Sequence, residues 1–332
     1  MRHLPRLLGT TLFFSAPLVL SFACSSTPEV RDDSDSGNDA GSDLGNGGVG
    51  SGDDVGIGPD GDSDGTGSGA RPGNGKPEVC DGVDNNDDGL VDNIDAGNDG
   101  VCDCIKIATI GIPGIHGNRD GKPGTNVFKS WLDGKSTAGV VDLALEELTA
   151  EKIASFDVIV AQDLRKGEYS EAEINVLHDW MKEGGGLMTM IGYGSPSERS
   201  NINAFLQPVG LSYGEDQILQ KDGTFTVPVN DMWNATHPIA NGIKAIGIDN
   251  GYPVDGDGIV IAEEGDFVTG QAKQVDKGRV FVWGDEWISY DSEWEQADAS
   301  PVKYEVERFW LNSIKWLGPQ DSCQVSIPTT IR

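Results

Sequence analysis

The chain has 332 residues and a formal net charge of −30. A protein that binds nucleic acid needs a basic surface to replace the counterions of the phosphates, so this composition argues against nucleic acid as a partner. The charge is unevenly distributed, because residues 25–104 carry twenty acidic and only three basic side chains. A solvated, acidic segment therefore precedes the part of the chain that can form a hydrophobic core.

Residues 1–24 have the pattern of an export signal. Two arginines precede an apolar stretch that contains Pro17 and is too short for a retained membrane helix. Residues 21–24, Ser-Phe-Ala-Cys, resemble the lipobox of bacterial lipoproteins, in which the cysteine becomes the lipid-modified first residue of the mature chain. The resemblance implies lipidation at Cys24 and a membrane-anchored lipoprotein of the cell envelope, at the outer membrane or the cell surface. The alternative is an ordinary signal peptide that leaves a soluble exported protein.

Residues 25–76 are rich in Gly, Asp, Ser and Asn and contain almost no large apolar side chain. Such a segment cannot bury enough apolar surface to offset the entropy lost on ordering its backbone. We expect a disordered tether with a typical end-to-end distance of about 40 Å, extended further by repulsion between its aspartates. It would hold the following residues clear of a membrane surface.

Four further cysteines occur, and an even number in an exported chain is expected to form disulfides. They are Cys80, Cys102, Cys104 and Cys323. We favour Cys80 paired with Cys102 or Cys104, and Cys323 paired with the other, because these arrangements join both ends of the folded domain. A zinc site formed by all four is the alternative, but Cys102 and Cys104 are separated by one residue and not by the usual two.

Residues 77–104 contain an acidic loop that fits the calcium-loop template when read from Asp84. Oxygen-bearing side chains occupy positions 1, 3 and 5, and Gly89 occupies position 6, where the chain turns sharply. The expected calcium ligands are Asp84, Asn86, Asp88, the carbonyl of Leu90, Asp92 and Asp95. Asp95 is shorter than the usual glutamate and no amphipathic helices flank the loop, so we expect a structural Ca²⁺ and not a switch. The alternative is a solvated linker of the same composition.

The same residues also resemble a metal-binding motif repeated in bacterial surface lipoproteins. The resemblance covers residues 78–92, with Asp87 in place of the motif's second cysteine. It leaves Cys80 without a local partner.

Residues 105–319 alternate between strand and helix patterns, and residues 320–332 are expected to form a C-terminal tail. The predicted strands are 105–112, 140–143, 156–161, 186–191, 259–262, 268–271 and 279–283. The predicted helices are 126–132, 170–182 and 302–317. Ser170 and Glu173 have the spacing of a capping box at the start of the second helix. This order predicts a flavodoxin-like, mostly parallel sheet with helices on both faces.

The turn after the fourth predicted strand reads Met190-Ile191-Gly192-Tyr193-Gly194. Together with residues 237–243, 278–285 and 309–317, it resembles class I glutamine amidotransferases and their ThuA-like relatives across 105–319. In the amidotransferases this turn reads Gly-x-Cys-x-Gly and its cysteine attacks the glutamine amide, whereas here Gly192 stands at the cysteine's place. Residues 161–165 replace the family's glycine-rich oxyanion loop. The resemblance therefore implies a domain without amidotransferase catalysis.

Open parallel sheets bind ligands beyond the carboxyl ends of their strands, and polar residues follow those ends here. The candidate ligand-binding residues are His116, Asn118, Arg119, Asp163, Arg165, Tyr193, Ser195, Asp285, Glu286 and Trp287. If they converge, they form a pocket with charges and an aromatic wall. The alternative is that these loops are polar for solvation alone.

Aromatic and acidic residues are densest between Trp283 and Trp294, a combination that suits the C–H faces and hydroxyl groups of sugars. We therefore predict a protein that binds a carbohydrate or another cell-envelope component. A hydrolase that acts on a sugar or envelope polymer through Asp285 or Glu286 is the first alternative. A structural spacer is the second.

Overall fold

The computed structural model describes residues 73–111, 124–135, 140–143, 146–162, 168–192, 196–218, 227–229, 232–248, 251–297 and 303–331. All of them lie in one unit of the chain, Thr66–Arg332. Cys24 and nearly all of the predicted tether lie outside the described residues. The same holds for seven of the candidate ligand-binding residues, His116, Asn118, Arg119, Asp163, Arg165, Tyr193 and Ser195.

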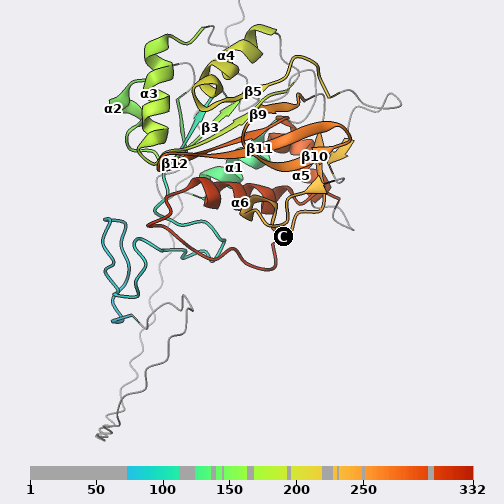
Figure 1. Ribbon diagram of the computed structural model, residues 1–332. Coiled ribbons are helices and arrows are strands. Elements are labelled where there is room, and N and C mark those ends of the chain that lie inside the picture. Colours follow the sequence, from blue (N-terminus) through green and yellow to red (C-terminus); the bar gives the residue numbers. More distant parts are fainter. Residues whose placement is uncertain are drawn as a thin grey trace, which may run out of the picture. The chain divides into compact units, whose positions relative to one another are not determined.

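A central sheet organises the described residues (Figure 1), and its eight strands have the order β2-β1-β3-β4-β12-β11-β10-β7. The bounds are β1 Ile107–Ile110, β2 Val140–Asp142, β3 Val158–Gln162, β4 Gly186–Met190, β7 Met232–Trp233, β10 Ile259–Glu264, β11 Phe267–Val275 and β12 Gly278–Trp283. The first five strands in this order are parallel to one another, as in a flavodoxin-like sheet. The predicted α/β class with a mostly parallel sheet is confirmed.

Strands β11, β10 and β7 extend the sheet in antiparallel pairing. Two-residue turns, Gly265-Asp266 and Asp276-Lys277, join β10 to β11 and β11 to β12. Both Gly265 and Asp276 adopt a positive φ, as tight hairpin turns require. Two smaller antiparallel pairs complete the strands, with β5 Leu211–Tyr213 beside β9 Val254–Gly256 and β6 Val227–Val229 beside β8 Ile246–Ile248.

Helices cover both faces of the sheet (Figure 1), because successive side chains of a strand point to opposite faces. Their bounds are α1 Asn126–Asp133, α2 Ala150–Ile153, α3 Glu171–Lys182, α4 Pro196–Leu206, α5 Asp291–Ala297 and α6 Val306–Leu317, with short 3₁₀ turns η1 Gln207–Val209, η3 Pro238–Ala240 and η4 Trp287–Ser289. In β3, Val158 and Val160 pack toward the layer of α1, α5 and α6, whereas Ile159 and Ala161 pack toward α2, α3 and α4. In the described part of the chain, no helix combines the length and apolar character that a membrane crossing requires.

The helix starts follow from local hydrogen bonds. At α3 the predicted capping box is present, since Ser170 Oγ accepts from Glu173 N and a Glu173 carboxylate oxygen accepts from Ser170 N. Helix α6 begins at Val306, later than predicted. The Glu305 carboxylate accepts from Lys244 N at 3.0 Å and Ala245 N at 2.9 Å, and its backbone is not helical. This contact ties the predicted first turn to the segment before β8.

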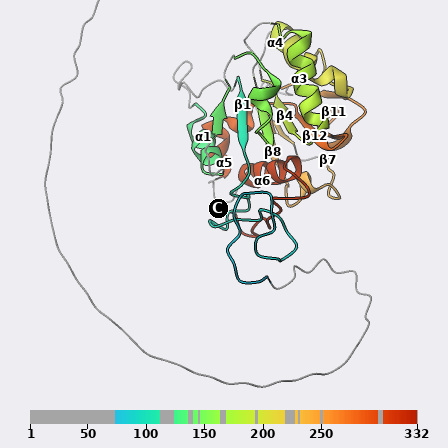
Figure 2. The same ribbon diagram turned by 90° about the vertical axis from the view of Figure 1, so that its left-hand side faces the viewer.

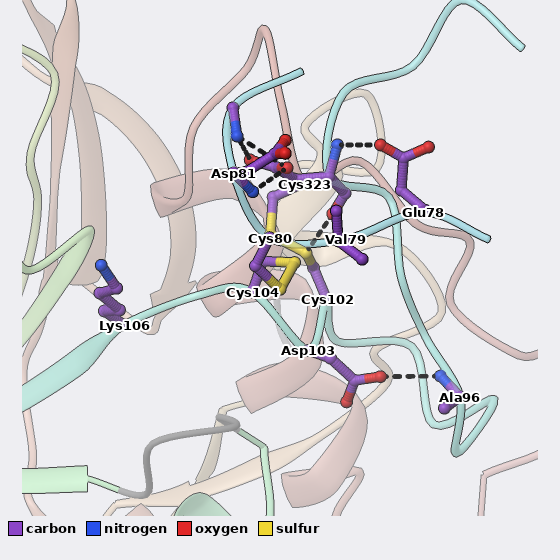
Figure 3. The surroundings of a disulfide bond; sticks show 12 residues. Glu78, Val79, Cys80, Asp81, Ala96, Cys102, Asp103, Cys104, Lys106 and Cys323 are labelled. Atoms are coloured by element: carbon purple, nitrogen blue, oxygen red, sulfur yellow. Dashed lines mark hydrogen bonds between the residues drawn. A yellow bond between two sulfur atoms is a disulfide. The ribbon is translucent and has the colours of Figure 1, made fainter. Parts of the chain in front are cut away.

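Residues 77–104, called the neck below, contain no helix or strand; one disulfide lies within the neck and a second joins it to the C-terminal segment (Figure 3). Cys80 pairs with Cys104 and Cys102 pairs with Cys323, which is one of the two arrangements favoured from the sequence. Val101 and Ile105 are buried in the core cluster of the α6 face. The neck therefore belongs to the folded unit and does not continue the tether.

The C-terminal residues 320–331 lie beside the neck, below α6 (Figure 2). Cys323 N donates to Val91 O at 2.8 Å, and Ile327 and Ile331 pack against the core cluster. Asp99 of the neck also forms a salt bridge of 2.7 Å with the buried Lys135. The predicted tail is thus part of the contact between neck and domain.

Candidate functional site

Strands β1, β3, β4 and β12 run in the same direction and end at one edge of the sheet. Gln162 is the last residue of β3, Gly192 lies just beyond β4, and Glu286 lies just beyond β12. Since β3, β4 and β12 are neighbours, the topology brings these three residues together. Residues 112–123, 163–167 and 193–195, which follow β1, β3 and β4, lie outside the described part of the chain.

The Glu286 side chain fills the space above Gly192. A Cβ built on Gly192 would overlap Glu286, whose Oε1, Cδ and Cγ are the three nearest atoms. Gly192 is buried, and its φ lies outside the left-handed region that a strained nucleophile turn adopts. Neither a cysteine nor any other side chain fits at residue 192 while Glu286 is in place.

Two neutral donors hold the Glu286 carboxylate, one on each oxygen. Gln162 Nε2 donates to Oε2 at 2.9 Å and the Tyr290 hydroxyl donates to Oε1 at 2.7 Å. Ser289 Oγ lies 3.1 Å from Gln162 Oε1 and 2.7 Å from the Glu286 carbonyl oxygen, and its single proton is available to one of them at a time. The Glu286 backbone is also fixed, because its N–H donates to Asp285 Oδ1 at 2.7 Å.

Asp285, the other carboxylate of this turn, points inward. Its side chain is 0% exposed, and it lies close enough to Tyr213 to affect that phenol electrostatically. Burial raises the pKa of Tyr213, and the Asp285 charge raises it further against the effect of the Thr189 hydrogen bond. The Tyr213 hydroxyl also donates to the carbonyl of Trp283 at 3.1 Å. Asp285 is therefore part of the protein interior and is not accessible to a ligand in solution.

The aromatic residues of this region are divided between the core and the edge. Trp283 is fully buried and stacks on Trp233 with ring centroids 5.9 Å apart, and Trp294 donates from its indole N–H to Ile288 O. Trp287 is half-buried, and its indole N–H donates to Ser292 Oγ at 2.7 Å. The Trp287 ring lies against Gly247, and its centroid is 6.0 Å from that of Tyr304, so these contacts lie on the α6 face and not against the Glu286 side chain.

Sequence reasoning singled out Glu286 but missed its anchors Gln162, Ser289 and Tyr290. The sequence carries a signal for Gln162, because it is a polar residue at the end of an otherwise apolar strand. In the structure its side chain is completely buried. No comparable signal marks Ser289 or Tyr290, since their role appears only when two distant strand ends meet.

In the neck, side-chain oxygens of the predicted calcium loop shape its turn. Asp84 accepts from Asp88 N at 3.2 Å and from Gly89 N at 2.9 Å, and Asn86 accepts from Asp88 N at 2.8 Å. Asp88 accepts from Leu90 N at 2.8 Å, and this bond is the main reason that the pKa of Asp88 is lowered. Gly89 has a φ of 92°. The turn gathers three of the predicted oxygen donors, a donor set that suits a hard cation such as Ca²⁺.

The remaining predicted calcium ligands face other partners. Asp92 accepts from Asp81 N and Gly82 N at 3.0 Å. Asp95 accepts from Asp99 N at 2.8 Å and Gly100 N at 2.9 Å, which repeats the pattern of the Asp84 turn. Across the described residues, no group of three or more His, Cys, Asp or Glu side chains is arranged to hold a metal ion. A ligand set of six would therefore require Asp92 and Asp95 to exchange their present hydrogen bonds.

No family model and no curated protein matches the chain. Among solved structures, a cytoplasmic protein from Salmonella typhimurium LT2 is similar over 64% of this chain and 100% of its own, with 18% identity and a TM-score of 0.48. A ThuA-like protein from Bacteroides uniformis is similar over 65% of this chain and 92% of its own, with 16% identity and a TM-score of 0.40. A β-galactosidase from Bacillus circulans sp. alkalophilus is similar over 63% of this chain and 30% of its own, with 12% identity and a TM-score of 0.40.

Proposed function

We propose that this protein is an exported, lipid-anchored ligand-binding protein whose α/β domain lacks amidotransferase catalysis. The observation that carries the proposal is the Glu286 side chain, which occupies the space that a nucleophile on residue 192 would need. The cysteines also support it. The four cysteines after Cys24 are joined in two disulfides, so none of them offers a thiol for covalent catalysis.

The ligand is a carbohydrate or another component of the cell envelope that binds at the carboxyl edge of the sheet. Glu286 and the Tyr290 hydroxyl supply polar contacts there. Hydrolysis of a sugar through Asp285 and Glu286 is disfavoured. Both carboxyl groups would have to reach the substrate, and Asp285 is completely buried.

A carbohydrate microarray followed by titration calorimetry tests this function on the full chain. Glu286→Ala should change the affinity about tenfold or more, because a hydrogen bond to a charged group contributes about 1.5 to 3 kcal/mol. Binding weakens if Glu286 contacts the ligand and tightens if Glu286 occupies the place of the ligand. Glu295→Ala is the matched control, since it also removes one carboxylate nearby but from an exposed position on α5. A folded protein that binds no glycan, or equal binding by wild type and Glu286→Ala, would count against the proposal.

The amino-terminal parts serve attachment and stability. Lipid on Cys24 anchors the protein to a membrane of the cell envelope, at the outer membrane or cell surface, and residues 25–76 are the tether. In the neck a structural Ca²⁺ is held by Asp84, Asn86, Asp88, the Leu90 carbonyl, Asp92 and Asp95, with a dissociation constant of about 10⁻⁴ to 10⁻³ M, as in extracellular modules. The preformed turn from Asp84 to Gly89 supports this part of the proposal.

A further inference from the structure

The surroundings of the Glu286 carboxylate form a small site of their own. The Cα of Gly192 is its floor, and the Gln162 amide and the Tyr290 hydroxyl are its two donors. We infer that these three residues form a carboxylate site that the chain fills with its own Glu286, and that the external ligand carries a carboxylate which binds by exchange with Glu286. The inference rests on the proposed function, since it concerns the ligand of the same edge.

The arrangement of donors favours a carboxylate. Among the described residues, Gln162 donates to one oxygen of Glu286 and Tyr290 donates to the other. Gln162 is 0% exposed, and its N–H group faces Glu286 while its carbonyl oxygen faces Ser289. A carboxylate accepts from both donors, whereas an amide accepts from Gln162 only and needs the Tyr290 hydroxyl to become an acceptor. Hydrogen bonds to an ionised acceptor are also about twice as strong as those between neutral groups.

Exchange requires only the side chain of Glu286 to move. Its backbone N–H is fixed by Asp285 and its carbonyl is fixed by Ser289. Glu286 is half-buried, so its side chain can rotate outward without opening the core. An internal group competes at an effective concentration in the millimolar range or above, so a free monocarboxylate should bind wild type weakly.

Acetate tests the site directly in the full chain. Glu286→Ala removes a methylene and a carboxylate, which together have the non-hydrogen atoms of acetate. We expect acetate to raise the melting temperature of Glu286→Ala and to bind it at least about tenfold more tightly than wild type, because the internal competitor is gone. Acetamide and sodium chloride at equal concentration should have no such effect. Adding Tyr290→Phe should remove most of the acetate response.

Equal responses to acetate and chloride in Glu286→Ala would overturn the inference, as would equal responses to acetate in wild type and Glu286→Ala. If Glu286→Ala does not fold, Glu286→Gln keeps the volume and replaces one oxygen by a donor. Its melting temperature should fall below that of wild type, and the fall should be smaller in a Tyr290→Phe background, because the hydrogen bond from Tyr290 to an ionised acceptor is already absent there. Equal falls in the two backgrounds would likewise overturn the inference.

The carbohydrate microarray separates this inference from the proposed function. We expect binding to glycans that contain uronic or sialic acid residues, and loss of binding when their carboxylates are converted to methyl esters. Equal binding to neutral and acidic glycans would refute the carboxylate inference and leave the ligand-binding function in place. Binding of acetate by Glu286→Ala without binding of any glycan would support the carboxylate inference and refute the carbohydrate-binding function.

Discussion

The Glu286 side chain fills the space in which any side chain on Gly192 would have to lie. The glycine at the turn and the glutamate beyond β12 are therefore one structural feature and not two independent ones. A chain with a cysteine at residue 192 would have to displace Glu286 from Gln162 and Tyr290. The packing at this edge of the sheet is therefore incompatible with a nucleophilic side chain at residue 192.

Gly192→Ala should destabilise the protein by about 1 to 3 kcal/mol, the usual cost of forcing an extra methyl group into a packed site. The cost should nearly vanish in a Glu286→Ala background, because the three atoms nearest to the new methyl group belong to Glu286. Urea unfolding of the four proteins of this double-mutant cycle measures the coupling. Additive free energies would show that Glu286 does not occupy this space in solution.

Stability should depend on the ionisation of Asp157. Burial is the largest effect on this carboxyl and raises its pKa above the usual 3.8, against the hydrogen bond from Lys106 N. Just above pH 3.8, the folded state therefore binds more protons at this residue than the unfolded chain does. The contribution of Asp157 to the free energy of unfolding is thus favourable at low pH and is lost as the pH rises through the folded pKa. Asp157→Asn should abolish this decrease in stability with rising pH. Unfolding free energies of wild type and Asp157→Asn, measured between about pH 3 and pH 7, test this.

Asp179→Asn is the control, because the contribution of Asp179 to stability changes with pH in the opposite direction. A hydrogen bond from Lys182 lowers the pKa of this exposed carboxyl, so its contribution is present above pH 3.8 and is lost as the pH falls. The two variants should therefore change the pH dependence in opposite directions. A difference between wild type and Asp157→Asn that does not vary with pH would contradict the assignment.

The two disulfides should differ in their contributions to stability. Cys80 and Cys104 are 24 residues apart, whereas Cys102 and Cys323 are 221 residues apart. Loop entropy in the unfolded chain predicts losses of about 3 kcal/mol for Cys80→Ala with Cys104→Ala and about 5 kcal/mol for Cys102→Ala with Cys323→Ala. Chemical unfolding measures the losses, and mass spectrometry of the alkylated wild-type chain checks the pairing. A smaller loss for the longer loop would contradict the expectation.

Calcium should stabilise the neck through the Asp84 turn. At Ca²⁺ concentrations about ten to a hundred times the dissociation constant, wild type should gain about 1 to 3 kcal/mol, and a chelator should reverse the gain. Asp84→Asn with Asp88→Asn should abolish the response. Asp87→Asn should retain it, because Asp87 accepts from Asn74 and is not among the proposed ligands. Identical melting curves with and without Ca²⁺ would remove the calcium proposal.

Attachment to the membrane should depend on the cysteine of the lipobox-like segment. Cys24→Ala should move the protein from the membrane fraction to the soluble fraction of its host and prevent incorporation of labelled palmitate. Ser26→Ala, two residues away, should behave like wild type. Membrane association that survives Cys24→Ala would show that another segment provides the anchor.

Much of the sheet could be predicted, because the strand and helix patterns between Val158 and Met190 are local. The apolar strands, the capping box at Ser170 and the glycines that end α3 each depend on residues only a few positions apart. The antiparallel extension was missed, although the turns at Gly265-Asp266 and Asp276-Lys277 have the length and residue types of tight hairpins. The position of β7 at the far edge has no local signal that we can identify.

The candidate site was predictable only in part. Glu286 follows a strand end, so its place at the carboxyl edge of the sheet could be inferred from topology alone. Its partner Gln162 is 124 residues away, and the contact exists because β3, β4 and β12 are neighbours in the folded sheet. The inward orientation of Asp285 was equally hidden, since adjacent residues at the end of a strand point to opposite sides. One sequence does not say which of the two faces the ligand.

The two disulfides also define a short mechanical path through the protein. A pull on the segment before Cys80 passes through sulfur to Cys104, along Asp103 to Cys102, and through sulfur again to Cys323. Tension between the segment before Cys80 and the residues after Cys323 therefore bypasses residues 105–322, which include every strand of the sheet. In a protein held by its amino-terminal segment, the sheet would carry none of the force applied at the carboxyl terminus.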